Sequence, residues 1–289
     1  MRLSERYKLL GVEFEEKADI LPSIRINTLK IEPEQIIQRL ESKGVELKKI
    51  EYLDFGYSYE SEFSLASTQE YLQGYFYIQE AASQLPVQVL GVKKNDKVLD
   101  MAASPGSKTT QIAQYTDNLI FALDVQRQRL ESLKNNVERL GVRNVVILNK
   151  DAKHADDLGQ FDKVLLDAPC SGNFCINPTY YKDRTVFDIK ERAKLQKDLI
   201  KTAYKCLKVG GFLVYSTCSL EVEENEEVID FALKNTGFEV IDTSLKIGDE
   251  GLTKTYDRTL DSSISKCRRF WPHKTGTEGF FIAKLVKKT

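Results

Sequence analysis

The sequence lacks the long apolar run that a membrane-spanning helix requires. None of its windows approaches ~18 consecutive apolar residues, and 29% of its 289 residues are charged. The amino terminus, MRLSERYKLLGVEFEEK, alternates charged and apolar residues too closely for a secretory signal. We therefore expect a cytoplasmic protein without membrane contact.

Cysteine and histidine are scarce. The two histidines, His154 and His273, are far apart in the chain, and only one close pair of cysteines is present, so we expect no metal site. An odd number of widely spaced cysteines does not match a secreted disulfide framework, and reduced thiols are expected. A disulfide between Cys175 and Cys267 remains an alternative. The cysteines are Cys170, Cys175, Cys206, Cys218 and Cys267.

The charges nearly cancel, with 42 basic and 43 acidic residues and a net charge of −1. The total therefore predicts no polyanionic partner. The distribution is uneven, because the charged residues of 266–289 are all basic except for Glu278, whereas EVEENEEVID (221–230) is strongly acidic. The ordinary interpretation of both segments is solvated surface.

From about residue 96 onward, short apolar runs alternate with amphipathic helical patterns, which is typical of a parallel, doubly wound α/β sheet. In such sheets ligands bind at the carboxyl ends of the strands. The expected helices include residues 126–141 and 188–210. The expected strands are KVLDM (97–101), NLIFALDV (118–125), NVVILNKD (144–151), KVLLDAP (163–169) and GFLVYSTCS (211–219).

The first 75 residues have a different pattern. A strand at 23–30, a helix at 32–44 opened by Pro33 and an extended stretch at 46–60 indicate a small α+β module. The sequence thus predicts two domains, residues 1–75 and 76–289. No Gly/Ser linker separates them, so we expect them to be packed together.

Three successive strand ends carry features of a cofactor site. DMAASPGSKTT (100–110) places small residues and Gly106 before a helix, where backbone can approach a ligand. Asp124 can accept hydrogen bonds from ribose hydroxyls, and Asp151 can meet an adenine edge, although either acid alone could simply cap a helix. Because GxGxxG is absent and the loop contains a proline, S-adenosylmethionine fits better than a dinucleotide.

The next two strands end in cysteines, in DAPCSG (167–172) and STCS (216–219). Lone cysteines are usually apolar filler, which is our interpretation of Cys206, Cys175 and Cys267. Cys170 and Cys218 differ, because small polar residues bracket both. Cys218 also precedes an expected acidic helix, 221–235, whose amino-terminal dipole would favour a thiolate.

A cysteine beside a methyl donor has a specific use. Carbon 5 of cytosine accepts a methyl group only after a thiolate adds to carbon 6 and raises the electron density at carbon 5. A carboxyl group against ring nitrogen 3 and the exocyclic amine stabilises that adduct, and Asp167 is the nearest candidate. A base must finally remove the proton from carbon 5 so that the thiol can leave.

These motifs resemble the Nop/Sun family of RNA cytosine-5 methyltransferases. The similarity covers nearly the whole chain, with further matches at RINTLK (25–30), YIQEAAS (77–83), DRTVFDI (183–189) and RRFWPH…GFFIAKL (268–285). The resemblance implies a Rossmann-like S-adenosylmethionine-dependent methyltransferase domain with a small, RNA-recognition-like amino-terminal module. It also implies that Cys218 is the nucleophile, that Cys170 assists product release, and that the substrate is RNA, with tRNA favoured over rRNA.

By the same resemblance, a group of residues lines the cofactor pocket, Arg129 helps to bind the cofactor, and Lys108 reaches the cytosine or Asp167. The family loop often has cysteine and a second glycine at the positions of Ala102 and Ser107. We expect a monomer. The pocket residues are Ala102, Ala103, Ser104, Pro105, Gly106, Ser107, Lys108, Asp124, Asp151 and Asp167.

The basic carboxyl end is the expected RNA surface. Arg268, Arg269 and Lys274 would meet phosphates, and Trp271 would stack on a base. An equally open alternative is that Trp271 covers the core.

Other function classes remain as alternatives. A DNA cytosine-5 methyltransferase would use the Pro-Cys cysteine, Cys170, as its nucleophile, which leaves Cys218 unexplained. A non-catalytic RNA-binding assembly factor would need neither the acids nor the cysteines. A small-molecule methyltransferase would also need neither cysteine.

Overall fold

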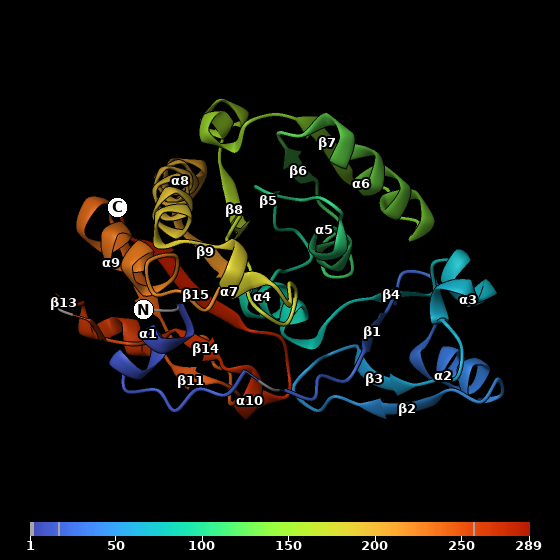
Figure 1. Ribbon diagram of the computed structural model, residues 1–289. Helices are drawn as coiled ribbons and strands as arrows, with labels where there is room; N and C mark the ends of the chain where they lie inside the picture. The colour runs from blue at the N-terminus through green and yellow to red at the C-terminus, as the bar shows by residue number, and fades with distance from the viewer. Residues whose placement is uncertain (1–2, 17, 257) are drawn as a thin grey trace.

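The computed structural model describes residues 3–16, 18–256 and 258–289, and in this part of the chain nine strands form one central sheet (Figure 1). Its order is β11-β14-β15-β9-β8-β5-β6-β7. Strand β10 pairs antiparallel with residues 284–287 of β15, beyond the residues that pair with β14. Strands β5 to β9 pair in parallel, and β15 is antiparallel to β9. The strands are β5 (Val98–Asp100), β6 (Ile120–Asp124), β7 (Val145–Asn149), β8 (Phe161–Asp167), β9 (Leu207–Thr217), β10 (Phe238–Ile241), β11 (Asp249–Glu250), β14 (Arg268–Phe270) and β15 (Phe280–Lys287). The predicted α/β methyltransferase architecture is confirmed.

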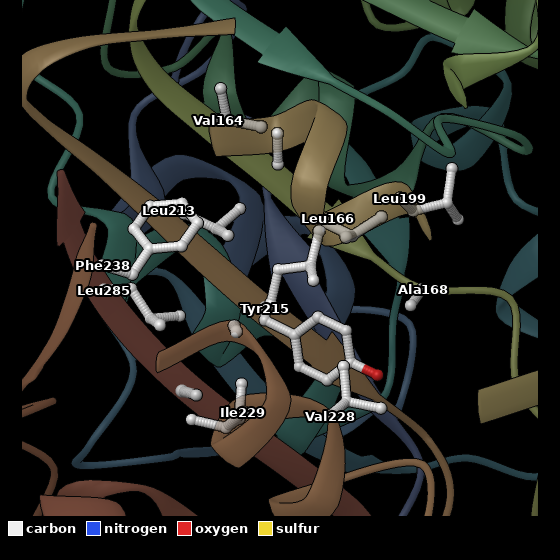
Figure 2. Packing of buried hydrophobic residues seen from close by; sticks show 14 of the residues in the cluster. Val164, Leu166, Ala168, Leu199, Leu213, Tyr215, Val228, Ile229, Phe238 and Leu285 are labelled. Atoms are coloured by element: carbon white, nitrogen blue, oxygen red, sulfur yellow. The ribbon is translucent and has the colours of Figure 1, made fainter. Parts of the chain in front are cut away.

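Helices cover both faces of this sheet, because the central strands are apolar on both sides. Along β9, Leu213 and Tyr215 pack under α8 (Val186–Cys206) and α9 (Glu226–Asn235), as Figure 2 shows with Val228 and Ile229. Val214 points to the other face, which α4 (Ala81–Leu90), α5 (Ser107–Ile112) and α6 (Arg127–Arg139) cover. This double cover leaves the carboxyl ends of the parallel strands as the open edge.

The small amino-terminal sheet is antiparallel, in the order β2-β3-β1-β4, and packs on α2 (Pro33–Glu41). Its strands are β1 (Ser23–Ile26), β2 (Glu46–Lys49), β3 (Gly56–Glu60) and β4 (Phe76–Ile78). Because β4 pairs with β1, this sheet continues three residues past the expected boundary at residue 75.

Helix α1 (Leu3–Leu9) lies on the large domain, not on the small sheet with which the sequence grouped it. The Tyr7 hydroxyl donates a hydrogen bond of 2.7 Å to Glu221, and the ring centroids of Tyr7 and Trp271 are 5.6 Å apart. Figure 1 shows α1 next to the orange and red carboxyl-terminal segments. Helix α1 therefore packs against the segment that follows β9 and against Trp271.

No helix among the described residues is long and apolar enough to cross a membrane. Within the same residues, no group of three or more His, Cys, Asp or Glu side chains is placed to hold a metal ion.

Candidate active site

The parallel pairing of β8 with β9 brings the two predicted cysteines together. Asp167 at the end of β8 lies opposite Ser216, so the turns that follow both strands leave the sheet side by side. The Sγ atoms of Cys170 and Cys218 are 3.0 Å apart and share a hydrogen bond. Two thiols that are 48 positions apart in sequence thus form one chemical unit.

Cys170 is a thiol that is difficult to deprotonate. Its hydrogen bond to Cys218, followed by burial and by the charge of Glu224, raises the pKa of Cys170 well above its usual value. A protonated Cys170 can donate a hydrogen bond to Cys218 and so stabilise negative charge on that sulfur.

Both cysteine turns rest on one carboxylate, that of Glu224. It accepts hydrogen bonds from the Ser171 amide at 3.0 Å, from the Ser219 hydroxyl at 3.0 Å and from Gln196 at 2.8 Å, and also from the Ser171 hydroxyl. Burial raises the pKa of Glu224. This carboxylate holds the residue after Cys170 and the residue after Cys218 in one place.

Two expectations for the acidic segment 221–230 are therefore wrong. Most of it is buried, because its carboxylates bind buried donors instead of water. Helix α9 begins at Glu226, eight positions after Cys218, so its dipole, whose influence falls off within the first turn, does not act on the Cys218 sulfur. The Cys170 thiol, and not the helix, is in hydrogen-bond contact with the Cys218 sulfur.

Lys108 reaches Asp167, one of the two outcomes that the resemblance implied. The Lys108 ammonium donates to Asp167 Oδ2 at 2.6 Å and to Ser83 Oγ at 3.0 Å, and Ser216 Oγ donates to Asp167 Oδ1 at 2.7 Å. Both oxygens of Asp167 are therefore held in fixed directions.

A cavity of about 250 Å³ joins these groups to the loop after β5. Cys218, Asp167 and Lys108 line it. The sequence did not single out several of its other walls, which are Ser83, Asp100, Ile176, Glu278 and Phe280. The predicted loop residues Ala102, Ala103, Ser104, Pro105 and Ser107 complete the lining.

A second cavity adjoins the first through Ala102, which lines both. Asp124 and Asp151 contribute its carboxylates. Its other walls are mostly apolar, and they include Met101, Val125, Ala152, Pro169, Leu195 and Leu199. Asp151 also accepts a hydrogen bond from the Lys153 amide at 2.9 Å, so it caps the following 3-10 helix as well as lining the cavity.

Arg129 connects the β5 loop to Asp124. Its Nη2 donates to the Ser104 carbonyl at 2.7 Å, and its Nη1 lies 3.6 Å from Asp124 Oδ2. Asp124 Oδ1 accepts from the Gln126 amide at 2.8 Å. Arg129 thus holds the loop and the acid in register.

The structure requires a glycine at position 106 for a reason other than the approach of a ligand. Its φ of +106° is unfavourable for other residues, and an added Cβ would lie 2.9 Å from a methyl carbon of Leu133 on α6. The glycine allows α5 to start close against α6.

Asp100 precedes this loop and is buried, at the wall of the cysteine cavity. It accepts a hydrogen bond of 2.7 Å from Thr109, and burial raises the pKa of Asp100 to about 6. Asp100 ends β5 and Thr109 lies on α5, so this hydrogen bond fixes the start of α5 against the end of β5.

Sequence reasoning did not single out Arg25, the first residue of the RINTLK motif. Its buried guanidinium on β1 donates to Gln79 at 2.6 Å, to the Ser107 carbonyl at 2.5 Å and to Thr110 at 2.9 Å. Burial lowers the pKa of Arg25 to about 9. The small domain is thereby anchored to the first turn of α5.

The predicted RNA surface is wrong for two of its residues. Arg269 has no exposed surface and pairs with Glu226, and Trp271 is 1% exposed, so the alternative that Trp271 covers the core is the right one. Arg268 is half-buried and donates to backbone carbonyls. Lys274 is exposed and forms an ion pair with Asp249.

All five cysteines, each in the described part of the chain, are free thiols, so Cys175 and Cys267 are not cross-linked. Cys206 and Cys267 are buried in the apolar core, as expected of filler.

Comparison with known proteins places this site in a family. The model of "16S rRNA methyltransferase RsmB/F" matches residues 87–286, and that of the "N-terminal domain of 16S rRNA methyltransferase RsmF" matches residues 5–81. The chain belongs to the RsmB/F methyltransferase family. The resemblance inferred from the sequence is confirmed, as is the dependence of the family on S-adenosylmethionine.

Relatives of this RsmB/F chain act on different RNAs. It is 39% identical to the 25S rRNA (cytosine-C(5))-methyltransferase nop2 of Schizosaccharomyces pombe, over 96% of this chain and 48% of nop2. It is 41% identical to the tRNA (cytosine(72)-C(5))-methyltransferase of Pyrococcus horikoshii, over 78% of this chain and 55% of that protein. The chain spans about half the length of these two curated relatives.

Solved structures agree with the fold. A methyltransferase homolog protein from Pyrococcus horikoshii superposes with a TM-score of 0.85 at 40% identity, covering 98% of this chain and 89% of that one. The structure of NSun6 from the same organism with SFG gives a TM-score of 0.84 at 28% identity, covering 99% and 94%.

The residues of the second cavity fit S-adenosylmethionine. Asp124 is buried, and Arg129 is its only cationic neighbour within ion-pair distance among the described residues, so the carboxylate can still accept hydrogen bonds from ribose hydroxyls. The apolar walls suit an adenine ring. Ser104 lines the adjoining cysteine cavity, and its Oγ is buried without a partner among the described residues.

Proposed function

We propose that this chain methylates carbon 5 of cytosine in RNA, using S-adenosylmethionine and a covalent adduct on Cys218. The observation that carries the proposal is the contact of 3.0 Å between Cys218 and Cys170 at a cavity that also holds Asp167 and Lys108. Neither a small-molecule methyltransferase nor a binding factor needs this pair of thiols.

The cofactor would be held by the second cavity. Asp124 would accept hydrogen bonds from the ribose hydroxyls, Asp151 would face the adenine edge, and residues 102–107 would flank the sulfonium end next to the cysteine cavity. Bound S-adenosylmethionine supplies the electrophilic methyl group. Arg129 keeps the loop against Asp124.

The residues of the chain would divide the remaining work. Cys218 would attack carbon 6 as a thiolate. The protonated Cys170 thiol would donate a hydrogen bond to the Cys218 sulfur before the attack, and again when that sulfur leaves carbon 6. Asp167 faces ring nitrogen 3 and the exocyclic amine, and its direction is fixed by Lys108 and Ser216. In this scheme Cys170 assists product release.

Transfer RNA is the proposed substrate class. The tRNA (cytosine(72)-C(5))-methyltransferase of Pyrococcus horikoshii, at 41% identity, supports this choice. Ribosomal RNA is the second candidate, because relatives from Schizosaccharomyces pombe and Homo sapiens that are named as rRNA methyltransferases have 39% and 40% identity. On the basic carboxyl end, we propose that Lys274, which is exposed, contacts a phosphate.

Two alanine variants test the division between the cysteines. Cys218→Ala should neither methylate nor cross-link to RNA, because it cannot add to carbon 6. Cys170→Ala should add and methylate but fail to finish, so a protein–RNA adduct should accumulate and survive denaturing electrophoresis. Unmodified tRNA transcripts, rRNA transcripts and DNA of the same sequences serve as substrates, with labelled S-adenosylmethionine as the methyl donor.

Cys206→Ala is the matched control, since this buried thiol on α8 lies away from the cavities. It should methylate like the parent chain. A stable adduct in Cys218→Ala and none in Cys170→Ala would assign the nucleophile to Cys170, as in the DNA-type mechanism. Methylation of DNA but of neither RNA would overturn the substrate class.

A further inference from the structure

Strand pairing places Glu278 beside the Cys218 turn. Phe281 on β15 lies opposite Thr217 on β9, so the residues just before β15 face the residues just after β9. The Asn173 amide donates to the Cys218 carbonyl at 2.7 Å and to the Gly279 carbonyl at 3.1 Å. One side chain therefore joins the backbone of Cys218 to that of the residue after Glu278.

The carboxylate of Glu278 borders the same cavity as Cys218 and Asp167. It is half-buried, and it receives no hydrogen bond from the described part of the chain, in contrast to Asp167, both of whose oxygens are engaged. Burial raises the pKa of Glu278, whereas the charge of Lys108 opposes that shift. A carboxylate with unused lone pairs in a cavity is able to accept a proton.

The proposed reaction leaves one task without a residue. After methylation, carbon 5 carries both the methyl group and a proton, and a base must take that proton. Cys170 shares a hydrogen bond with Cys218, and its raised pKa keeps a proton on its sulfur near neutral pH, so it is not a free base. Asp167 is held by Lys108 and Ser216 for the opposite edge of the ring.

We propose that Glu278 is the base that removes the proton from carbon 5 of the methylated adduct. The proton passes from carbon 5 to a Glu278 oxygen, and the electron pair of the broken C–H bond forms the double bond between carbons 5 and 6. The bond between carbon 6 and Cys218 Sγ breaks, and its electron pair stays on sulfur as a thiolate. Glu278 then returns the proton to water. This inference rests on the proposed function.

The test follows tritium at carbon 5. The substrate is the RNA class that the parent chain methylates, transcribed with [5-³H]CTP, and release of ³H to water is measured together with methyl transfer and adduct. Glu278→Gln should transfer about one methyl group per enzyme, accumulate an adduct that resists denaturation, and release ³H roughly 10²- to 10⁴-fold more slowly. Glu278→Asp should recover part of the rate.

Glu250→Gln is the matched control, because Glu250 is an exposed carboxylate on β11, and it should behave like the parent. Release of ³H by Glu278→Gln within tenfold of the parent rate would overturn the proposal. Loss of both adduct and methyl transfer, with cofactor binding retained, would also overturn it, because Glu278 would then act before methylation.

The cysteine variant separates the two candidate bases. If Glu278→Gln released ³H normally while Cys170→Ala did not, the base would be Cys170. A parent chain that methylates no cytosine in tRNA or rRNA would remove the proposed function itself, which is a different outcome from any of these.

Discussion

Arg269 and Glu226 form an ion pair in which neither side chain has exposed surface. Arg269 Nε and Nη2 donate to the two oxygens of Glu226 at 2.8 and 2.7 Å, and Nη1 donates to the Leu220 carbonyl at 2.7 Å. The pair connects β14 to the first turn of α9 and to the segment that follows Cys218. It therefore holds the backbone two residues after Cys218 in place.

Removing one partner of this pair should be costly. Arg269→Met leaves Glu226 buried and unpaired, and we expect a loss of about 3–5 kcal/mol in the free energy of unfolding, measured by urea denaturation. The control is Lys274→Met, which breaks an exposed pair with Asp249 and should cost less than about 1 kcal/mol. Equal losses in the two variants would contradict a stabilising role for the buried pair.

Glu224→Gln should slow the chemical step without weakening RNA binding. The amide keeps one acceptor oxygen but loses the charge and one of the sites that hold Ser171 and Ser219, so the cysteines lose alignment. We expect kcat to fall by about tenfold or more, equivalent to roughly 1.4 kcal/mol, with KM for RNA unchanged. The rate of adduct formation measures the effect directly, and a rise in KM alone would argue against a positioning role.

Asp124→Ala should weaken binding of S-adenosylmethionine. The lost hydrogen bonds between ribose hydroxyls and a charged acceptor correspond to ~1.5–3 kcal/mol, or roughly ten- to a hundredfold in Kd. Calorimetry measures this change. Asp117→Ala, which removes an exposed carboxylate elsewhere on the surface, should leave the affinity unchanged. Unchanged affinity in Asp124→Ala would require another residue to bind the ribose.

Glu80 should make the protein less stable as the pH rises through neutrality. Burial, followed by the charge of Glu278, raises the pKa of Glu80 to about 7 from the usual 4.5. The folded state therefore holds a proton that the unfolded state releases. The resulting stability is complete below about pH 4.5 and is lost as the pH rises through about 7, with an upper limit on the order of 3 kcal/mol.

Glu80→Gln removes this titration, because glutamine resembles the protonated acid. Urea unfolding at about pH 5 and about pH 8 should therefore show a smaller difference for the variant than for the parent chain. Glu221, whose pKa burial also raises to about 7, is unchanged in both proteins and cancels from the comparison. An equal difference in both proteins would mean that Glu80 is ionised in the folded state at both pH values.

The sequence by itself determined the parallel part of the sheet, β5 to β9, and the identity of the two thiols. Continuous apolar runs can be strands only where both faces are covered, and the residues that end such strands must meet at one edge. For this reason DAPCSG and STCS predicted that Cys170 and Cys218 lie at the same edge of the sheet, where their sulfur atoms are 3.0 Å apart. The position of Asp124 followed from the same rule.

Only the tertiary structure decided which charged residues are buried. Glu224 and Arg269 belong to segments whose composition is typical of a solvated surface, and each is buried because donors or acceptors arrive from distant elements. Glu278 reaches the cysteine cavity because β15 inserts antiparallel beside β9, a pairing that no local pattern encodes. The physical reason is that a lone charge cannot be buried, but a charge matched by long-range partners can be.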